Sequence, residues 1–437
     1  MQLEPISILT GLLQQSPGAK ELEITYLPLP DDIYESVSFL KDGIHLGIHA
    51  PHVPQLAREF RKSYYGLRKK LMMHANSKSG DEKSFGLLMG SISCLLLLCP
   101  DHASAWSDRK RLLLHRLDEL KASSCVRDTN NSADYSTIWE GEMSYLDLLF
   151  TQHSKAPNAW SHRRWICKQM LRATHNVNQM NHLEMSSTQL MTWFTHEIDV
   201  CINIAERKPK NYYAWTHRRF IIGTLVDRLE KTEDRDHELK VMSLLKSEVG
   251  CIHPWLCRHI SDHSAAHYGG EVYRLWLSVG NQALDSVGDA MKSKEEEIHQ
   301  NLKLSWELIE LYPSHEVIWI WRRISASFFL EYKKSKENIR SDFSRDSKKK
   351  FVENEIAMVA NIRNEESSSD DEIGSLKSQH AISYLSWILR KIDTKIVDVD
   401  ISNVRSSLIF DDNDVLQCLW SNISRAPGKC VEPDKWV

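Results

Sequence analysis

One short stretch concentrates side chains that could bind a carboxylate or another anion. Residues 209–222 read PKNYYAWTHRRFII, with a lysine, a histidine and two arginines around one tryptophan. A partly buried arginine needs a carboxylate or carbonyl partner, so Arg218 predicts an ion pair with a neighbouring helix. Glu142 and Glu206 are both candidate partners on earlier segments, and the sequence does not choose between them. Lys210 lies in a turn, where a lysine is usually solvated.

A second group has residue types that bind metals. Four of its members form a Cys-x-His-x3-Cys-x-His pattern, and two more histidines follow: Cys251, His253, Cys257, His259, His263 and His267. Structural zinc sites favour C-x2–4-C and H-x3–5-H pairs, whereas a one-residue gap points two side chains to opposite sides of a helix. The pattern favours ordinary helix packing, and we predict no metal in this chain. The sequence has no glycine-rich phosphate loop and no Ser-His-Asp order.

The first stretch is one copy of a repeat. In four places a tryptophan is followed by arginine at +3 and a basic residue at +4: Trp106/Arg109, Trp160/Arg163, Trp215/Arg218 and Trp319/Arg322. The tryptophans are 54, 55 and 104 residues apart (160 − 106, 215 − 160, 319 − 215), and the last interval is 2 × 52. A degenerate copy fills this gap, with Ala266 in the tryptophan position and Gly269 in the arginine position. Five copies at a fixed period predict a stacked repeat fold.

Each copy is predicted to be a helical hairpin. First helices are expected over residues 84–98, 138–151, 187–207, 238–260 and 296–311, and second helices over 104–120, 158–173, 212–229, 264–278 and 316–332. In the second helix of copy three, Trp215, Ile222, Val226 and Leu229 fall on one face. One hairpin cannot bury such a face alone, so stacked copies must build the core. The repeat tryptophans and arginines are therefore interpreted as packing residues.

The predicted fold class is all-α, an α-α superhelix or solenoid of about five hairpins. The chain is divided into a partly helical N-terminal preamble, the five-repeat solenoid, a charged disordered linker and a C-terminal helical cap, over residues 1–83, 84–332, 333–378 and 379–437. Within the preamble, residues 43–54 are expected to form a loop and residues 55–73 a basic helix. The linker combines a basic, serine-rich run with an acidic run, a composition that cannot bury enough surface to fold.

Composition narrows the classes of function. The 437 residues are 42% hydrophobic, and 55 basic against 59 acidic side chains leave a net charge of −4, which suggests neither a nucleic-acid nor a membrane surface. Nine scattered cysteines without a secretory signal indicate reduced thiols. The longest apolar run, Cys94–Cys99, is far too short to span a bilayer. We expect a cytoplasmic protein with no membrane span.

The pattern Pro-x-Asn-Tyr-x-x-Trp-x-His-Arg-Arg resembles the α-subunit repeat of protein prenyltransferases. Residues 209–219 match it at almost every position, and the resemblance covers about 84–332. It implies a helical crescent that pairs with a separate β subunit and is inactive alone. The zinc is expected on that β subunit, so no cofactor is expected in this chain. The long period and the degenerate copy resemble a repeat-containing branch of the family, which implies the Rab geranylgeranyltransferase β subunit as partner.

The resemblance also implies a reaction. A geranylgeranyl group would pass from its prenyl diphosphate to a cysteine of a protein such as a SNARE or an F-box protein. Negative charge builds on the leaving diphosphate, so cationic groups held beside it stabilise the transition state. In the family, a lysine five residues before a repeat tryptophan reaches the diphosphate, and a tyrosine lies close by. The matching residues are Lys210 and Tyr212, with Lys155 as a further diphosphate ligand.

Two other functions stay open. The degenerate fourth copy and the long insertions fit a non-catalytic α-solenoid adaptor that binds protein partners. A tetratricopeptide-like peptide binder is a third alternative. The Trp-x-His-Arg-Arg core argues against it, because tetratricopeptide repeats place small residues at the helix crossing. Loss of Lys210 separates the first two functions, because only an enzyme would lose turnover.

Overall fold

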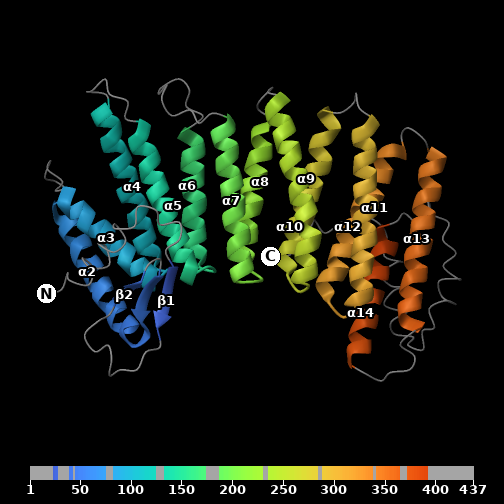
Figure 1. Ribbon diagram of the computed structural model, residues 1–437, viewed down its shortest axis with the longest axis horizontal. Helices are drawn as coiled ribbons and strands as arrows, with labels where there is room; N and C mark the ends of the chain where they lie inside the picture. The colour runs from blue at the N-terminus through green and yellow to red at the C-terminus, as the bar shows by residue number, and fades with distance from the viewer. Residues whose placement is uncertain are drawn as a thin grey trace. The chain divides into compact units, whose positions relative to one another are not determined.

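A computed structural model describes residues 23–27, 39–42, 45–74, 82–124, 132–173, 187–229, 235–283, 288–337, 341–364 and 372–391 (Figure 1). The chain forms two compact units, residues 1–222 and 223–437. The predicted all-α fold is confirmed, because the described residues are almost entirely helical and alternate as antiparallel hairpins. The predicted solenoid over 84–332 has residues in both units.

Three hairpins begin in the first unit. They are α3 (Glu82–Leu98) with α4 (Ala103–Ser124), α5 (Ser132–Gln152) with α6 (Pro157–Ala173), and α7 (Ser187–Arg207) with α8 (Tyr212–Leu229), whose last turns belong to the second unit. First helices pack on first helices, as α5 does on α7, and second helices pack on second helices, as α4 does on α6. In Figure 1, α4 to α7 stand side by side. The hairpins therefore make two layers of helices, as a stacked repeat requires.

The preamble holds a small sheet that the sequence did not reveal. Strands β1 (Glu23–Leu27), β3 (His45–His49) and β2 (Phe39–Asp42) lie in that order, with β3 parallel to β1 and antiparallel to β2. The prediction of a loop over residues 43–54 is wrong for β3, where Leu46 and Ile48 are fully buried. Five residues, two of them histidines, give too short a pattern to be recognised as a strand.

The rest of the preamble connects the sheet to the first hairpin. The short helix η2 (Ala50–His52) leads into α2 (Val53–His74), which confirms the predicted basic helix and packs on α3. The backbone N–H of Ile24 in β1 donates to Thr151 Oγ1 at 3.0 Å, near the end of α5. The Tyr26 hydroxyl lies 3.2 Å from His153 Nε2. The sheet therefore docks on the turn that joins α5 to α6.

The second unit also contains three hairpins. They are α9 (Arg235–Arg258) with α10 (His263–Ala283), α11 (Gly288–Leu311) with α12 (Glu316–Glu337), and α13 (Ser341–Asn364) with α14 (Glu372–Lys391). The first two match the predicted fourth and fifth repeats. Here too, second helices pack on second helices, since α12 contacts both α10 and α14. Among the described residues, no helix has the length and hydropathy needed to cross a membrane.

The third hairpin of this unit corrects a prediction. The disordered linker expected over 333–378 is wrong for Ser341–Asn364, which form α13, and for the start of α14. Val352, Ile356 and Val359 form a buried stripe on α13 at helical spacing. The basic and acidic runs on either side dominated the composition and concealed this stripe. The predicted cap over 379–437 is helical as far as Lys391, and its remainder lies outside the described residues.

Candidate functional site at the hairpin turns

The four repeat tryptophans are buried in the core of their hairpins. Trp106, Trp160, Trp215 and Trp319 are at most 4% exposed. Three of the indole N–H groups donate to a carbonyl six residues earlier, from Trp106 to Pro100 at 2.7 Å, from Trp160 to Ser154 at 2.8 Å and from Trp319 to Pro313 at 2.7 Å. Each of these tryptophans fills the core and fixes the turn in front of its own helix.

The repeat arginines join one hairpin to the next. Arg109 binds Glu142 through two hydrogen bonds, at 2.5 and 2.8 Å, and Arg163 binds Glu197 at 2.8 and 2.7 Å. Each acid lies on the first helix of the following hairpin and is buried. Of the two acids offered as partners of Arg218, Glu142 instead binds Arg109, and Glu206 is exposed. Arg218 Nη1 donates to the carbonyl of Ile198 at 2.8 Å. A bidentate arginine–carboxylate pair fixes the spacing between hairpins as well as their charge balance.

A histidine completes each of these networks. His162 Nε2 lies 2.7 Å from Glu142 Oε1, and His217 Nε2 lies 3.0 Å from Glu197 Oε2. Burial alone would raise the pKa of Glu142, but the Arg109 charge and the hydrogen bond from His162 outweigh it and lower that pKa to about 2. Burial lowers the pKa of both histidines. Each histidine is therefore neutral near pH 7 and donates Nε2–H to an ionised carboxylate.

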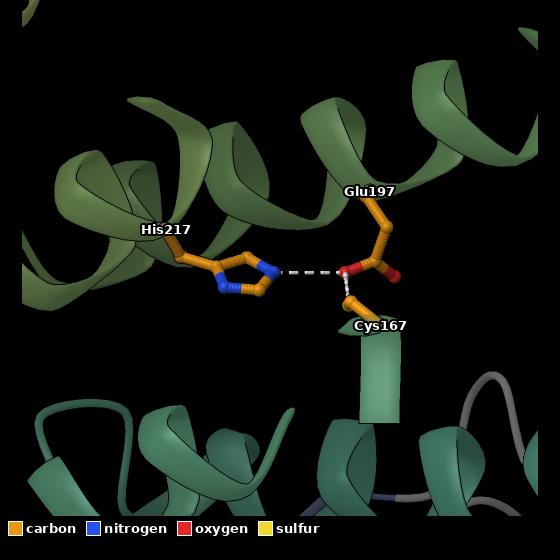
Figure 2. Close-up of side chains that lie close together, drawn as sticks. All are labelled: Cys167, Glu197 and His217. Atoms are coloured by element: carbon orange, nitrogen blue, oxygen red, sulfur yellow. Dashed lines mark hydrogen bonds and ion pairs between the residues drawn. The ribbon is translucent and has the colours of Figure 1, made fainter. Parts of the chain in front are cut away.

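One network includes a thiol and has the residue types of a metal site. Figure 2 shows Cys167, Glu197 and His217 pointing toward one another, with Cys167 Sγ 3.9 Å from Glu197 Oε2. Burial raises the pKa of the Cys167 thiol, so it stays protonated. Arg163 already binds both oxygens of Glu197. The same Arg–Glu–His arrangement recurs around Glu142 without a thiol, which indicates a packing role.

The Cys/His pattern of residues 251–267 does not converge. Cys251 donates to the carbonyl of Glu248 at 3.0 Å, and the ring of His259 packs against Trp255 at 4.2 Å. His253 and Cys257 approach each other at 3.7 Å on one exposed face of α9. His263 and His267 are exposed on the next helix. The absence of a metal in this chain stays a prediction.

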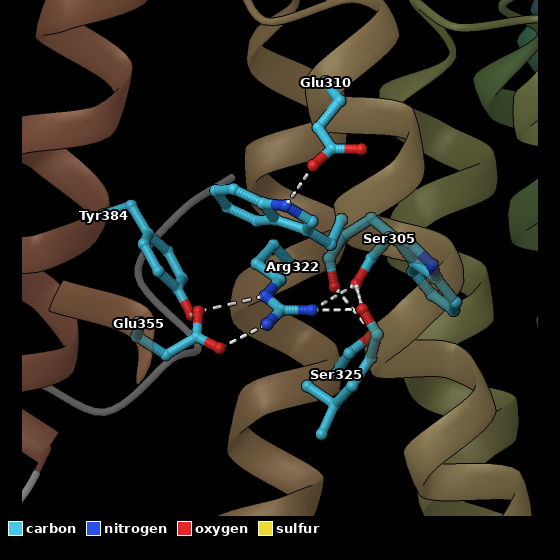
Figure 3. Close-up of polar contacts among 9 residues, drawn as sticks. Ser305, Glu310, Arg322, Ser325, Glu355 and Tyr384 are labelled. Atoms are coloured by element: carbon cyan, nitrogen blue, oxygen red, sulfur yellow. Dashed lines mark hydrogen bonds and ion pairs between the residues drawn. The ribbon is translucent and has the colours of Figure 1, made fainter. Parts of the chain in front are cut away.

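The sixth hairpin repeats the network with a different donor. Figure 3 shows Arg322 between Glu355 of α13 and Ser305 of α11. Arg322 Nε lies 3.1 Å from Glu355, and the Tyr384 hydroxyl donates to the same carboxylate at 2.6 Å. Tyr384 thus takes the place that histidine has in the earlier hairpins. Ala381, three residues before it, is fully buried, as Ala159 is three residues before His162.

The residues predicted to bind a diphosphate lie at the turns, outside these networks. Lys210 is exposed and has a φ of 58°, which is a left-handed backbone conformation that non-glycine residues rarely adopt. It stands between the end of α7 and Asn211, whose Oδ1 accepts a hydrogen bond from the N–H of Ala214 and caps α8. Strained backbone of this kind concentrates at functional sites. Tyr212, the first residue of α8, is 60% exposed.

Lys155 has a different environment from Lys210. Its Nζ donates to the carbonyl of Pro209 at 3.2 Å, and Asn211 Nδ2 donates back to the carbonyl of Ser154 at 2.8 Å. These two bonds clasp the α5–α6 turn to the α7–α8 turn. Lys155 therefore lies beside Lys210 and supports its turn through the backbone. The sequence did not reveal this function of Asn211, although an asparagine directly before a helix signals a cap.

The site has a positive electrostatic character. Lys155 and Lys210 lie on adjoining turns, and the first turn of α8 contains no acidic residue to neutralise the positive end of its helix dipole. Exposed backbone N–H groups and cations at a helix start are suited to phosphate-bearing ligands. The Tyr212 hydroxyl adds a hydrogen-bond donor at the same exposed edge.

The fold and these repeats define a class of protein. The protein prenyltransferase alpha subunit repeat matches residues 139–170 and 194–225, which cover most of the α5–α6 and α7–α8 hairpins. These matches include the Trp160 and Trp215 networks. Two hairpins of this chain therefore match the repeat of the protein prenyltransferase alpha subunits.

Particular relatives support the same assignment. The chain is 27% identical over 268 residues to human protein prenyltransferase alpha subunit repeat-containing protein 1, covering 55% of this chain and 58% of the human protein. The match to the Danio rerio protein of that name is 24% over 337 residues, covering 72% and 69%. Geranylgeranyl transferase type-2 subunit alpha of Saccharomyces cerevisiae is 23% identical over 157 residues, covering 36% and 39%. The match thus spans less than two thirds of the human relative's length.

Proposed function

We propose that this chain is the α-type subunit of a cytoplasmic, heterodimeric protein geranylgeranyltransferase. The observation that carries the proposal is the pair of clasped turns, which sets Lys210 and Tyr212 on an exposed edge beside Lys155. Family membership supports a partner β subunit in general. The Rab geranylgeranyltransferase β subunit is the partner we propose, and it would supply zinc and most of the lipid pocket.

In this proposal Lys210 binds the diphosphate of the lipid donor. As the bond from the allylic carbon to the diphosphate oxygen breaks, the cysteine sulfur forms the new bond and the diphosphate leaves with extra negative charge. A cation already held at that oxygen stabilises the transition state without reorganising. The left-handed backbone at Lys210 and the Lys155–Pro209 bond serve to hold the side chain in place. Tyr212 contributes a hydroxyl donor to the same group.

The acceptor in this proposal is a cysteine of a protein substrate, such as a SNARE or an F-box protein. The β subunit would supply most of the lipid pocket, so turnover would require it. In this proposal no nucleic acid takes part, and no helix of the described residues crosses a membrane. The diphosphate chemistry is common to farnesyl and geranylgeranyl donors, and the geranylgeranyl assignment follows the similarity to type-2 alpha subunits.

Replacement of Lys210 tests the proposal directly. The chain is co-expressed with candidate prenyltransferase β subunits, and transfer of labelled geranylgeranyl diphosphate to protein substrates is measured on the purified complex. Lys210→Ala is expected to lower turnover about a hundredfold while leaving assembly intact. Lys208→Ala is the matched control, because Lys208 is exposed in the same turn but two residues away. Equal turnover in both variants would remove Lys210 from the mechanism.

A non-catalytic adaptor is the second candidate, and one observation favours it. Gly269 replaces the repeat arginine in α10, and the ring of Trp321 occupies the space above it. The fourth hairpin has therefore lost the shared ion pair while keeping a packed core, as binding without catalysis would permit. A chain that stays monomeric and folded with every β subunit would favour the adaptor. A complex that labels a cysteine would exclude it.

A further inference from the structure

A row of cations runs along the second helices of the first unit. Lys110 Nζ lies 5.5 Å from the ring of Trp165, and Arg164 and Lys168 lie 5.7 and 5.6 Å from the ring of Phe220. Arg219 is exposed beside Phe220. We call Lys110, Arg164, Lys168 and Arg219 the cation ladder. Lys110, Arg164 and Lys168 each reach from one second helix to an aromatic ring of the next, and Arg219 extends the row on α8.

The ladder lacks acidic partners in the part of the chain that the structure describes. Helix α6 contains no Asp or Glu, and in α8 the sole acid is Asp227, near its end. Helix α4 has Asp108, Asp118 and Glu119, of which Asp108 pairs with Arg68 and Arg111, and Glu119 pairs with Arg116. Arg164 Nε is buried without a hydrogen-bond partner. Burial lowers the pKa of Lys110, and no carboxylate opposes that effect. A buried donor left unpaired is unfavourable.

The opposite layer has the reverse charge. Helix α5 carries four acidic residues and no lysine or arginine, namely Asp134, Glu140, Glu142 and Asp147. Helices α5 and α6 of one hairpin therefore separate their charges, with the acids on α5 and the cations on α6. The repeat networks use Glu142 and Asp147, but they do not use the ladder. This asymmetry points to an external ligand for the second-helix layer.

We propose that the cation ladder is a docking surface for an acidic face of another protein. Arginine and tryptophan side by side are enriched at the centres of protein interfaces. Packed helices lie about 8–10 Å apart, so the ladder cations recur at that interval and fit carboxylates spaced alike on the partner. A nucleic acid is disfavoured because the chain has a net charge of −4 and acids on the neighbouring layer.

The first experiment reverses two exposed ladder charges. Binding of the Lys168→Glu/Arg219→Glu variant to purified prenyltransferase β subunits is measured by calorimetry at two salt concentrations. The choice of this probe rests on the proposed function, whereas the surface itself does not. The dissociation constant is expected to rise about tenfold or more, with the wild-type affinity falling as salt increases. Arg61→Glu/Lys62→Glu is the matched control, since both residues are exposed on α2. Equal binding by both double variants would show that the ladder is not a docking surface. The proposed function would not be affected by that result.

If no β subunit binds, a second measurement tests whether the cation ladder binds an acidic ligand. A fluorescent oligoglutamate peptide and a single-stranded oligonucleotide of equal charge are titrated with the wild type and with the same two double variants. The ladder requires that the peptide bind the wild type and the α2 control, and that ladder reversal abolish this binding. No peptide binding, or tighter binding of the oligonucleotide, would overturn it. The failure of every β subunit to bind would count against the proposed function, independently of the peptide result.

Discussion

The second hairpin of the first unit and the first hairpin of the second unit fill the same positions with different chemistry. In α6, His162 donates to Glu142 and Arg163 binds Glu197 on the next hairpin. In α10, Tyr268 donates to Glu248 at the histidine position, and Gly269 stands at the arginine position. The donor to the acid survives in both hairpins, although the arginine does not. The repeat therefore conserves a set of spatial positions more strictly than it conserves residue types.

The loss of an arginine at Gly269 is compensated by packing. A Cβ at this position would lie 2.7 Å from Ile252 Cγ2 and 2.8 Å from Trp321 Cζ3. Trp321 stands two residues after Trp319, where α6 has a histidine, and it is 2% exposed. The fourth hairpin has no side chain at Gly269, and the Trp321 ring of the fifth hairpin occupies that space. The ionic junction seen in the first unit is thus replaced by an apolar junction between α10 and α12, whereas α12 and α13 keep an ionic one through Arg322 and Glu355.

The largest effect should come from breaking the ionic junction. Glu197→Ala leaves Arg163 and His217 buried without their shared carboxylate, so the free energy of unfolding should fall by about 3–5 kcal/mol. Urea denaturation followed by circular dichroism measures this loss. Glu206→Ala on the same helix removes an exposed acid and should cost less than about 1 kcal/mol. Equal losses in the two variants would show that the buried network contributes no more than a surface charge.

Acid should weaken the same kind of junction in a predictable pH range. Glu142 has a pKa of about 2 in the folded chain, below the value near 4.5 of a free carboxyl. A group with a depressed folded pKa stabilises the fold above its unfolded pKa, and this stabilisation disappears as pH falls from about 5 toward 2. Unfolding free energy should decline over that range by about 3 kcal/mol for this group alone. Glu142→Gln should remove its part of the slope. An unchanged slope would mean that Glu142 does not control acid stability.

How far the sequence could predict this molecule depends on the length and spacing of each pattern. The tryptophan period located five hairpins, and the helix bounds agree closely because each copy carries the same amphipathic stretch. The sequence pattern did not predict the sixth hairpin. The position two residues before Tyr384 is Ile382 and not tryptophan, and the segment between its two helices is longer than in the other hairpins. The sequence left Glu142 and Glu206 open as partners of Arg218. In the structure Glu142 binds Arg109, and Arg218 Nη1 donates to the carbonyl of Ile198. Which helix faces which side chain is set by the folded structure.

The candidate site shows the same limit. The spacing to the tryptophan selected both Lys210 and Lys155, and Lys155 ranked below Lys210 because Pro157-Asn158 replaces the Asn-Tyr pair. Their backbones differ, because α6 begins with Pro157 whereas α8 is capped by Asn211. The hydrogen bond from Lys155 to Pro209 joins residues 54 positions apart, and local spacing carries no information about such a contact.

The apolar junction can be broken by one methyl group. Gly269→Ala should lower the free energy of unfolding by about 1–3 kcal/mol, because Ile252 and Trp321 must both move to admit the Cβ. Gly250→Ala is the matched control, since a Cβ there meets nothing within 4 Å. That control should stabilise its helix by about 0.5–1 kcal/mol. Thermal unfolding of the two variants should therefore shift in opposite directions, and shifts of the same sign would argue against the packing account.

The smallest effect separates the backbone of the candidate site from its side chain. Lys210→Gly relieves the left-handed strain at φ 58° and should raise the free energy of unfolding by about 0.5–1 kcal/mol, after the added entropy of the unfolded chain is counted. Lys208→Gly, in the same turn but without a positive φ, should instead destabilise slightly. If the strained turn serves to aim an ammonium group, Lys210→Gly must gain stability and lose prenyl transfer together. A variant that gains stability and keeps full transfer would show that the strain belongs to the turn alone.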